Sequence, residues 1–198
     1  MQHEIEAKFL EVSHDMLRQK LAKLGARQVY PMRLMRRRNF DFPDKRLDSV
    51  KSWVRLRDEG DKVELMLKQS VGNQMGDIRE TPVIVDDFEK ASQFLLSIGM
   101  IQKSEQESRR ELWVYKNVEI MLDEWPWVKP FIEIEAPEKQ LVIDFAQQLD
   151  LSWDQAIFDT VEPVYYNEYD VTRQQIHALE TMRFSDPIPK ILKPKAKK

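Results

Sequence analysis

HEIEAKFL, residues 3–10, alternates apolar and charged side chains near the start of the chain. Because successive side chains of a β-strand point to opposite faces, Glu4, Glu6 and Lys8 would share one face and the apolar residues between them the other. A half-buried antiparallel strand often shows this alternation with its polar face in water. A solvated face is therefore the first interpretation, and the other strands decide whether it holds.

Composition excludes several classes of protein. The 198 residues can form one domain with a sizeable core, and 42% are hydrophobic and 33% charged. A net charge of -3 gives no general attraction to nucleic acid or anionic membranes. There is no cysteine, which excludes disulfides and thiolate chemistry. No apolar run approaches the ~20 residues of a membrane span, and no signal peptide is evident. We expect a cytoplasmic protein with no membrane partner and no specific nucleic-acid partner.

Periodicity predicts a domain with more strands than helices. Helices are predicted at 13–25, 86–99, 138–151 and 172–184, where apolar residues recur at helical spacing. Strands or hairpins are predicted at 39–44, 52–68, 78–85, 109–123 and 130–136. Hairpin connections favour a mostly antiparallel α+β fold. Residues 1–185 are interpreted as a single domain, and residues 186–198 as a disordered basic tail rich in proline and lysine.

The other predicted strands repeat the charged face of residues 3–10. Their polar positions hold acids and bases rather than the Ser, Thr and Gln typical of a solvated face. The acids are Glu4, Glu6, Glu64, Asp123, Glu133 and Glu135, and the bases are Lys8, Arg55, Arg57 and Lys68. Alternate arginines can clamp an oxyanion, and paired carboxylates suit a hard divalent cation. If the strands close into a barrel with these faces inward, the lumen would suit a metal-bound polyphosphate.

These residues resemble the CYTH domain family, also called triphosphate tunnel metalloenzymes. The motif E-x-E-x-K appears as Glu4-Ile5-Glu6-Ala7-Lys8. Further strand motifs follow in family order, and the resemblance covers roughly residues 1 to 140. They are VRLR (54–57), ELMLK (64–68), IRE (78–80), RRELW (109–113), MLDE (121–124) and FIEIE (131–135).

The resemblance implies an eight-stranded antiparallel β-barrel with flanking helices and a triphosphate-binding tunnel. The residues that it implies for the triphosphate are Lys8, Arg55, Arg57, Lys68, Arg79 and Arg110. Those that it implies for Mg²⁺ or Mn²⁺ are Glu4, Glu6, Asp123, Glu133 and Glu135. Glu4, Glu6 and Lys8 are the catalytic candidates, with Glu4 or Glu6 orienting the attacking water.

Several positions stay open in the sequence. Strand parity does not decide whether Arg109 or Arg110 faces inward, although the spacing to Trp113 favours Arg110. Arg79 and Glu80 share this ambiguity because Pro82 can shift the register. The basic run 36–38 fits a solvated segment at least as well as a substrate clamp. Trp125 and Trp127 are interpreted as packing residues, with base stacking as the weaker alternative.

The leading functional hypothesis is a metal-dependent triphosphatase acting on inorganic tripolyphosphate, a nucleoside triphosphate or thiamine triphosphate. A class IV-type adenylyl cyclase, which makes cyclic AMP and pyrophosphate from ATP, is the alternative within the same site. A non-catalytic polyphosphate- or nucleotide-binding protein is the alternative from another class. The sequence does not name the substrate, and it leaves the oligomeric state open, although dimers are common in the family.

Overall fold

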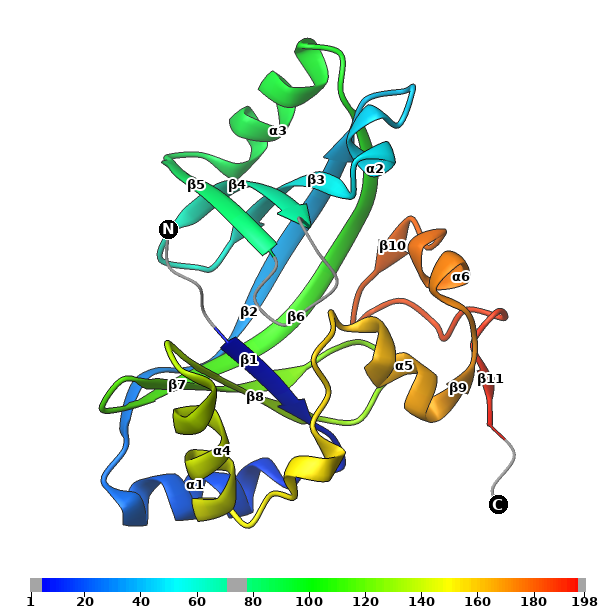
Figure 1. Cartoon of the computed structure of the whole chain (residues 1–198). Helices are drawn as coiled ribbons and strands as arrows, with labels where there is room; N and C mark the ends of the chain where they lie inside the picture. Colours follow the sequence, from blue (N-terminus) through cyan, green and yellow to red (C-terminus); the bar gives the residue numbers. More distant parts are fainter. Residues whose placement is uncertain (1–4, 71–77, 196–198) are drawn as a thin grey trace.

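The computed structural model describes residues 5–70 and 78–195, and a curled antiparallel sheet forms its centre (Figure 1). Eight strands follow in the spatial order β1-β8-β7-β6-β2-β3-β4-β5. Their bounds are Ile5–Phe9 (β1), Phe131–Ala136 (β8), Val118–Glu124 (β7), Ile101–Tyr115 (β6), Arg27–Asp41 (β2), Ser52–Asp58 (β3), Val63–Ser70 (β4) and Ile78–Val85 (β5). Among the described residues no pairing joins β1 to β5. The predicted fold of eight antiparallel strands with flanking helices is confirmed, with the sheet curled into a half-barrel.

Two strands of 15 residues each, β2 and β6, connect the two halves of the sheet. They pair antiparallel from Arg27 opposite Val114 to Asp41 opposite Ile101, with irregularities in register. In Figure 1, β1, β7 and β8 lie toward one end of this pair and β3, β4 and β5 toward the other. The sequence analysis predicted only the ends of these long strands. In β6 the missed residues 102–108 are all polar, and in β2 Pro31 and shifts in register interrupt the period of two.

The helices cover the outer, apolar side of the sheet. Helices α1 (His14–Leu24) and α4 (Lys139–Gln148) pack over the half that contains β1, β7 and β8. Helices α2 (Arg46–Ser49) and α3 (Phe88–Ser97) pack over the other half. In α1, the Ser13 side chain accepts a hydrogen bond from the Met16 backbone N–H at 3.4 Å, and Gly25 ends the helix at a φ of 78°.

Two apolar cores under these helices fix which face of each strand points outward. One contains Leu17 and Leu21 of α1, Phe145 of α4 and the sheet residues Ile120 and Ile132. The other packs α3 on Phe40 and Leu56. We call the opposite side of the sheet the inner face. Because side chains alternate, the charged residues that lie between these apolar residues along each strand point to this inner face.

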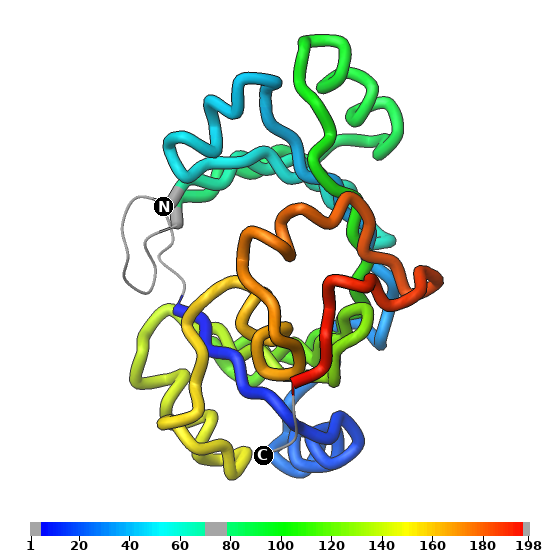
Figure 2. The backbone as a smooth tube through the Cα atoms, turned by 90° about the vertical axis from the view of Figure 1, so that its right-hand side faces the viewer, coloured from blue at the N-terminus to red at the C-terminus, as the bar shows by residue number. Residues whose placement is uncertain are grey.

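The C-terminal segment, residues 153–195, lies at one end of the curled sheet (Figures 1 and 2). It contains η1 (Trp153–Gln155), α5 (Glu162–Glu168), β9 (Tyr169–Asp170), α6 (Arg173–His177), β10 (Thr181–Met182) and β11 (Lys193–Pro194). Strand β10 pairs in parallel with β6. In a third apolar core, Val164, Tyr165 and Ile176 of this segment pack against Trp125, which follows β7, and Phe131 of β8.

The prediction of a disordered tail is wrong for residues 186–195. Leu192 is buried in the third core, and β11 pairs with β9. The proline- and lysine-rich composition suggested disorder, but Ile191 and Leu192 find apolar partners that the sequence pattern did not reveal. Residues 196–198 lie outside the described part of the chain.

Candidate functional site

Three glutamates come together on the inner face of β1 and β8. Glu6 is opposite Glu135, and Lys8 is opposite Glu133, in the antiparallel register. One carboxylate oxygen from each of Glu6, Glu133 and Glu135 lies within 4.8 Å of the others. Their neighbours in sequence, such as Ile132 and Ile134, lie in the helix-covered core. The period of two in β1 and β8 therefore concentrates carboxylates at one place.

Lys8 partly compensates this negative charge. Its Nζ lies 2.6 Å from Glu6 Oε1 and 3.7 Å from Glu133 Oε2. Burial, followed by the charge of Glu133, raises the pKa of Glu6. Although burial opposes it, the charges of Lys8 and then Arg110 lower the pKa of Glu133 well below its ordinary value. The two carboxyl groups therefore differ in proton affinity, with Glu133 the more strongly ionised.

Arg110 anchors a second carboxylate beside this group. Its Nε and Nη2 donate to the two oxygens of Asp123 at 2.7 Å each, and Nη2 also lies 3.2 Å from Glu133 Oε2. Arg109 points to the opposite side, where its guanidinium lies 4.2 Å from the ring centroid of Phe184. The structure therefore resolves the open position in favour of Arg110. Asp123 is held by Arg110 and is not part of the compact group of three glutamates.

Arg55, Arg57 and Lys68 lie on the inner face of the other half of the sheet. Arg55 Nη2 is 3.7 Å and Arg57 Nη2 is 3.4 Å from Glu64 Oε1, and Lys68 forms an ion pair with Glu80. The buried Nε atoms of both arginines have no hydrogen-bond partner within the described part of the chain. Burial and then the charge of Arg57 lower the pKa of Arg55 to about 10. Burial and then Arg55 lower the pKa of Lys68 to about 8.

The inner face thus carries two clusters of charged residues. The carboxylate group is the cluster of glutamates on β1 and β8, and the basic group is the cluster of Arg55, Arg57 and Lys68 on β3 and β4. Buried donors without partners cost free energy unless a ligand supplies acceptors. An anion with many oxygens, bound together with a divalent cation, would satisfy both groups. This is the arrangement that the CYTH resemblance implies, and a comparison with known families tests it.

A family model of the CYTH domain matches residues 2–165. The chain belongs to the CYTH domain family. Among curated proteins, a sequence search finds no match.

Solved structures share this CYTH fold at low sequence identity. A candidate adenylate cyclase from Vibrio parahaemolyticus is 16% identical with a TM-score of 0.73, over 83% of this chain and 98% of that chain. A protein from Pyrococcus horikoshii is 22% identical with a TM-score of 0.67, over 81% and 98%. A candidate adenylyl cyclase from Hippeastrum, described as having a dominant triphosphatase activity, is 16% identical with a TM-score of 0.60, over 84% and 96%. At these identities the likeness shows the fold.

One predicted site residue of this CYTH chain, Arg79, does not lie on the inner face. Arg79 is opposite Gln69 in the β4–β5 register, whereas Glu80 is opposite Lys68. Arg79 therefore lies on the other face of the sheet from Lys68, and Glu80 takes the inner position. Pro82 had left this parity undecided in the sequence. Glu4 lies outside the described residues.

Sequence reasoning overlooked several inner-face residues. Arg37 of β2 is opposite Arg57 of β3, and its Nη2 donates to Ser108 Oγ at 2.5 Å. Glu59, which directly follows β3, is buried and forms an ion pair with Arg57. Phe40 lies in the helix-covered core, so in a continuous strand Arg36 and Arg38 point to the same side as Phe40 and Arg37 points to the inner face. That signal was unusable while β2 was thought to begin at residue 39.

Trp125 and Trp127 are packing residues, as the sequence analysis favoured. Both belong to the third apolar core, and Trp127 Nε1 donates to the backbone oxygen of Asp186 at 2.9 Å. The three arginines of residues 36–38 lie on two faces of the sheet. Arg37 is on the inner face, whereas the guanidinium groups of Arg36 and Arg38 lie on the helix side, 5.1 and 4.8 Å from the ring centroid of Phe88.

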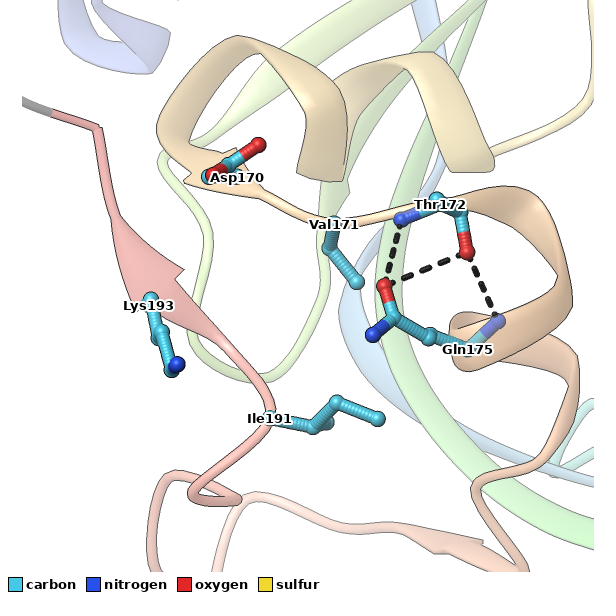
Figure 3. A pocket seen from close by; sticks show the side chains of 6 residues that line it. All are labelled: Asp170, Val171, Thr172, Gln175, Ile191 and Lys193. Carbon is cyan, nitrogen blue, oxygen red and sulfur yellow. Dashed lines mark hydrogen bonds between the residues drawn. The ribbon is translucent and has the colours of Figure 1, made fainter.

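A separate cavity of about 300 Å³ lies within the C-terminal segment (Figure 3). The lining residues are Asp170, Val171, Thr172, Gln175, Ile191 and Lys193. Three hydrogen bonds between Thr172 and Gln175 form the capping box that begins α6. The polar groups of Thr172 and Gln175 therefore serve to begin α6, and they need no ligand as a hydrogen-bond partner. Within residues 5–70 and 78–195, no helix is long and apolar enough to cross a membrane.

Proposed function

We propose that this chain is a metal-dependent hydrolase of triphosphate-containing substrates. The main observation is that one inner face of the sheet holds both the three clustered glutamates and basic side chains whose buried Nε atoms have no hydrogen-bond partner among the described residues. Inorganic tripolyphosphate, nucleoside triphosphates and thiamine triphosphate all present the required oxyanions. Because the chain has no cysteine and no serine-nucleophile motif, direct attack by water is the simplest route.

The donor set fits a hard divalent cation. Glu6, Glu133 and Glu135 offer carboxylate oxygens within 4.8 Å of one another, and Mg²⁺ and Mn²⁺ prefer such ligands. Burial and Glu133 raise the pKa of Glu6, which a positive charge between the two carboxylates would reverse. A bound Mg²⁺ or Mn²⁺ would neutralise phosphoryl oxygens and lower the pKa of a water molecule.

The chain's own cations would bind and align the triphosphate. Arg55 and Arg57 present buried Nε donors that have no partner among the residues that the structure describes, and Lys68 adds a charge from β4. Arg110 and Lys8 contribute from the half of the sheet that holds the carboxylates. A substrate spanning both groups would lie along the inner face. Holding it there would stabilise the charge that develops on the oxygens during phosphoryl transfer.

Glu6 is the residue best placed to orient an attacking water. One of its oxygens accepts a hydrogen bond from Lys8, which fixes the carboxylate beside the proposed cation. Lys8 holds Glu6 and Glu133 in place through its two contacts. Glu4 remains a proposed ligand and catalytic residue from the family motif alone.

Phosphate release from tripolyphosphate, ATP and thiamine triphosphate tests the proposal. We expect turnover with Mg²⁺ or Mn²⁺, none with EDTA, and a loss of about 100-fold or more in Glu6→Gln. Glu138→Gln is the control, since Glu138 is exposed and its side chain makes no capping bond. Release of pyrophosphate and cyclic AMP from ATP would instead identify a cyclase. Binding without turnover of any of the three would identify a binding protein.

A further inference from the structure

Arg37 differs from the other inner-face cations. Its guanidinium has no carboxylate within ion-pairing distance among the described residues, whereas Arg55, Arg57 and Arg110 each have at least one. Nη2 donates to the neutral Ser108 hydroxyl, and the buried Nε has no partner in residues 5–70 and 78–195. A buried guanidinium with only neutral partners needs an anion to offset its desolvation.

Like charges surround this guanidinium. Arg37 is directly cross-strand from Arg57, an arrangement of two cations that destabilises a sheet unless an anion lies between them. Burial, followed by the charges of Arg55, Arg57 and Arg110, holds the pKa of Arg37 well below its ordinary value. The region between these arginines is thus a preformed anion subsite beyond the motif residues Arg55 and Arg57.

An aromatic ring covers the Arg37 guanidinium. The guanidinium carbon lies 4.4 Å from the ring centroid of Trp125, which packs with the fully buried Tyr165 of α5. The Tyr165 hydroxyl donates to the backbone oxygen of Pro126 at 3.0 Å. The C-terminal segment lies in front of the sheet at this end in Figure 2, in agreement with its place in Figure 1. Trp125 therefore covers the Arg37 guanidinium, and the C-terminal segment supports Trp125 through this packing.

We propose that Arg37 and Ser108 bind the terminal phosphoryl group, so that the site accepts only triphosphates with one unsubstituted end. This inference rests on the proposed function for the identity of the ligand. Arg37 supplies a planar fork of donors and Ser108 supplies one hydroxyl, which matches a terminal phosphate with three free oxygens. A nucleoside or thiamine group would then extend from the opposite end of the triphosphate.

Equilibrium binding in EDTA tests this subsite without turnover. Calorimetry would compare tripolyphosphate, ATP and a dinucleoside triphosphate that carries a nucleoside at both ends. We expect the doubly substituted compound to bind wild type at least about 10-fold more weakly than ATP. We expect Arg37→Gln to weaken tripolyphosphate binding roughly 10- to 100-fold, and Arg37→Lys to restore part of the loss.

Arg36→Gln is the matched control, because Arg36 is the adjacent arginine on the other face, is exposed, and pairs with Asp58 at 2.7 Å. It should leave binding unchanged. Equal affinity of ATP and the doubly substituted compound would overturn the inference, as would wild-type affinity in a folded Arg37→Gln. Should that variant not fold, the ligand comparison on wild type decides alone. Failure of the hydrolase proposal is separable, since it appears as absent phosphate release with metal while this binding pattern persists.

Discussion

Lys68 shows how one buried position links charge to function. Burial and the neighbouring Arg55 lower its pKa to about 8, from an ordinary value of 10.5. Between these two values the folded protein without ligand holds Lys68 largely neutral, while the unfolded chain keeps it protonated. Stability from this group therefore rises with pH across that window. A bound polyanion would favour the protonated form and reverse the shift.

We expect triphosphate binding to take up most of one proton at about pH 9, which lies between the pKa of about 8 of Lys68 in the free protein and its ordinary value of 10.5, and below the pKa of about 10 of Arg55. Calorimetry in two buffers of different ionisation enthalpy measures the uptake at this pH. Lys68→Gln should abolish it, whereas Lys90→Gln, at an exposed position of α3, should retain it. Identical uptake in wild type and Lys68→Gln would show that another group titrates.

At the scale of elements, β2 and β6 do most to create the site. Each contributes to both halves of the sheet, so Arg37 and Arg110 come close to residues far away in sequence. The short elements of the C-terminal segment act differently, because they hold one end of the inner face through apolar packing. Leu192 anchors the last of them in the third core.

Leu192→Ala should lower the free energy of unfolding by about 2–4 kcal/mol, because it removes a buried side chain and leaves a cavity. Urea denaturation followed by tryptophan fluorescence measures the loss, and Trp125 and Trp127 report on the same core. Ile188→Ala is the control, since Ile188 is 58% exposed and should change stability by less than about 0.5 kcal/mol. Equal small effects in the two variants would mean that the segment detaches in solution.

On the scale of the whole molecule, the sheet places a carboxylate group and a basic group on one inner face. The basic group leaves Nε atoms of Arg37, Arg55 and Arg57 unpaired within the described residues. The folded protein therefore carries unfavourable electrostatic interactions that a bound ligand would relieve. Such a molecule is more stable with its ligand than without it.

Tripolyphosphate at about 100 times its Kd should stabilise the fold by about 2.7 kcal/mol and raise the Tm by several degrees. Differential scanning calorimetry in EDTA measures this shift. Sulfate at matched ionic strength is the control for general salt effects and should give a much smaller rise. A rise of the same size with sulfate would contradict a site built for a chain of phosphates.

The sequence by itself determined the α+β class, the alternation of each short strand and most of the charged residues on one face. The strand period of two is a local property, so Glu6, Lys8, Arg55 and Arg57 could be assigned to one side of their strands. The family motif then implied their chemistry. The three glutamates that the structure brings together, Glu6, Glu133 and Glu135, were all among the predicted metal ligands.

Only the tertiary structure decided which member of each basic run faces inward. Arg37 and Arg110 are inside while Arg36 and Arg109 are outside, and Glu80 rather than Arg79 meets Lys68. Parity can be counted only once strand limits, bulges and partners are known, and a shift of one residue exchanges the two faces. The packing of Leu192 likewise depended on residues far away in sequence, because burial is a property of the assembled core and not of the local composition.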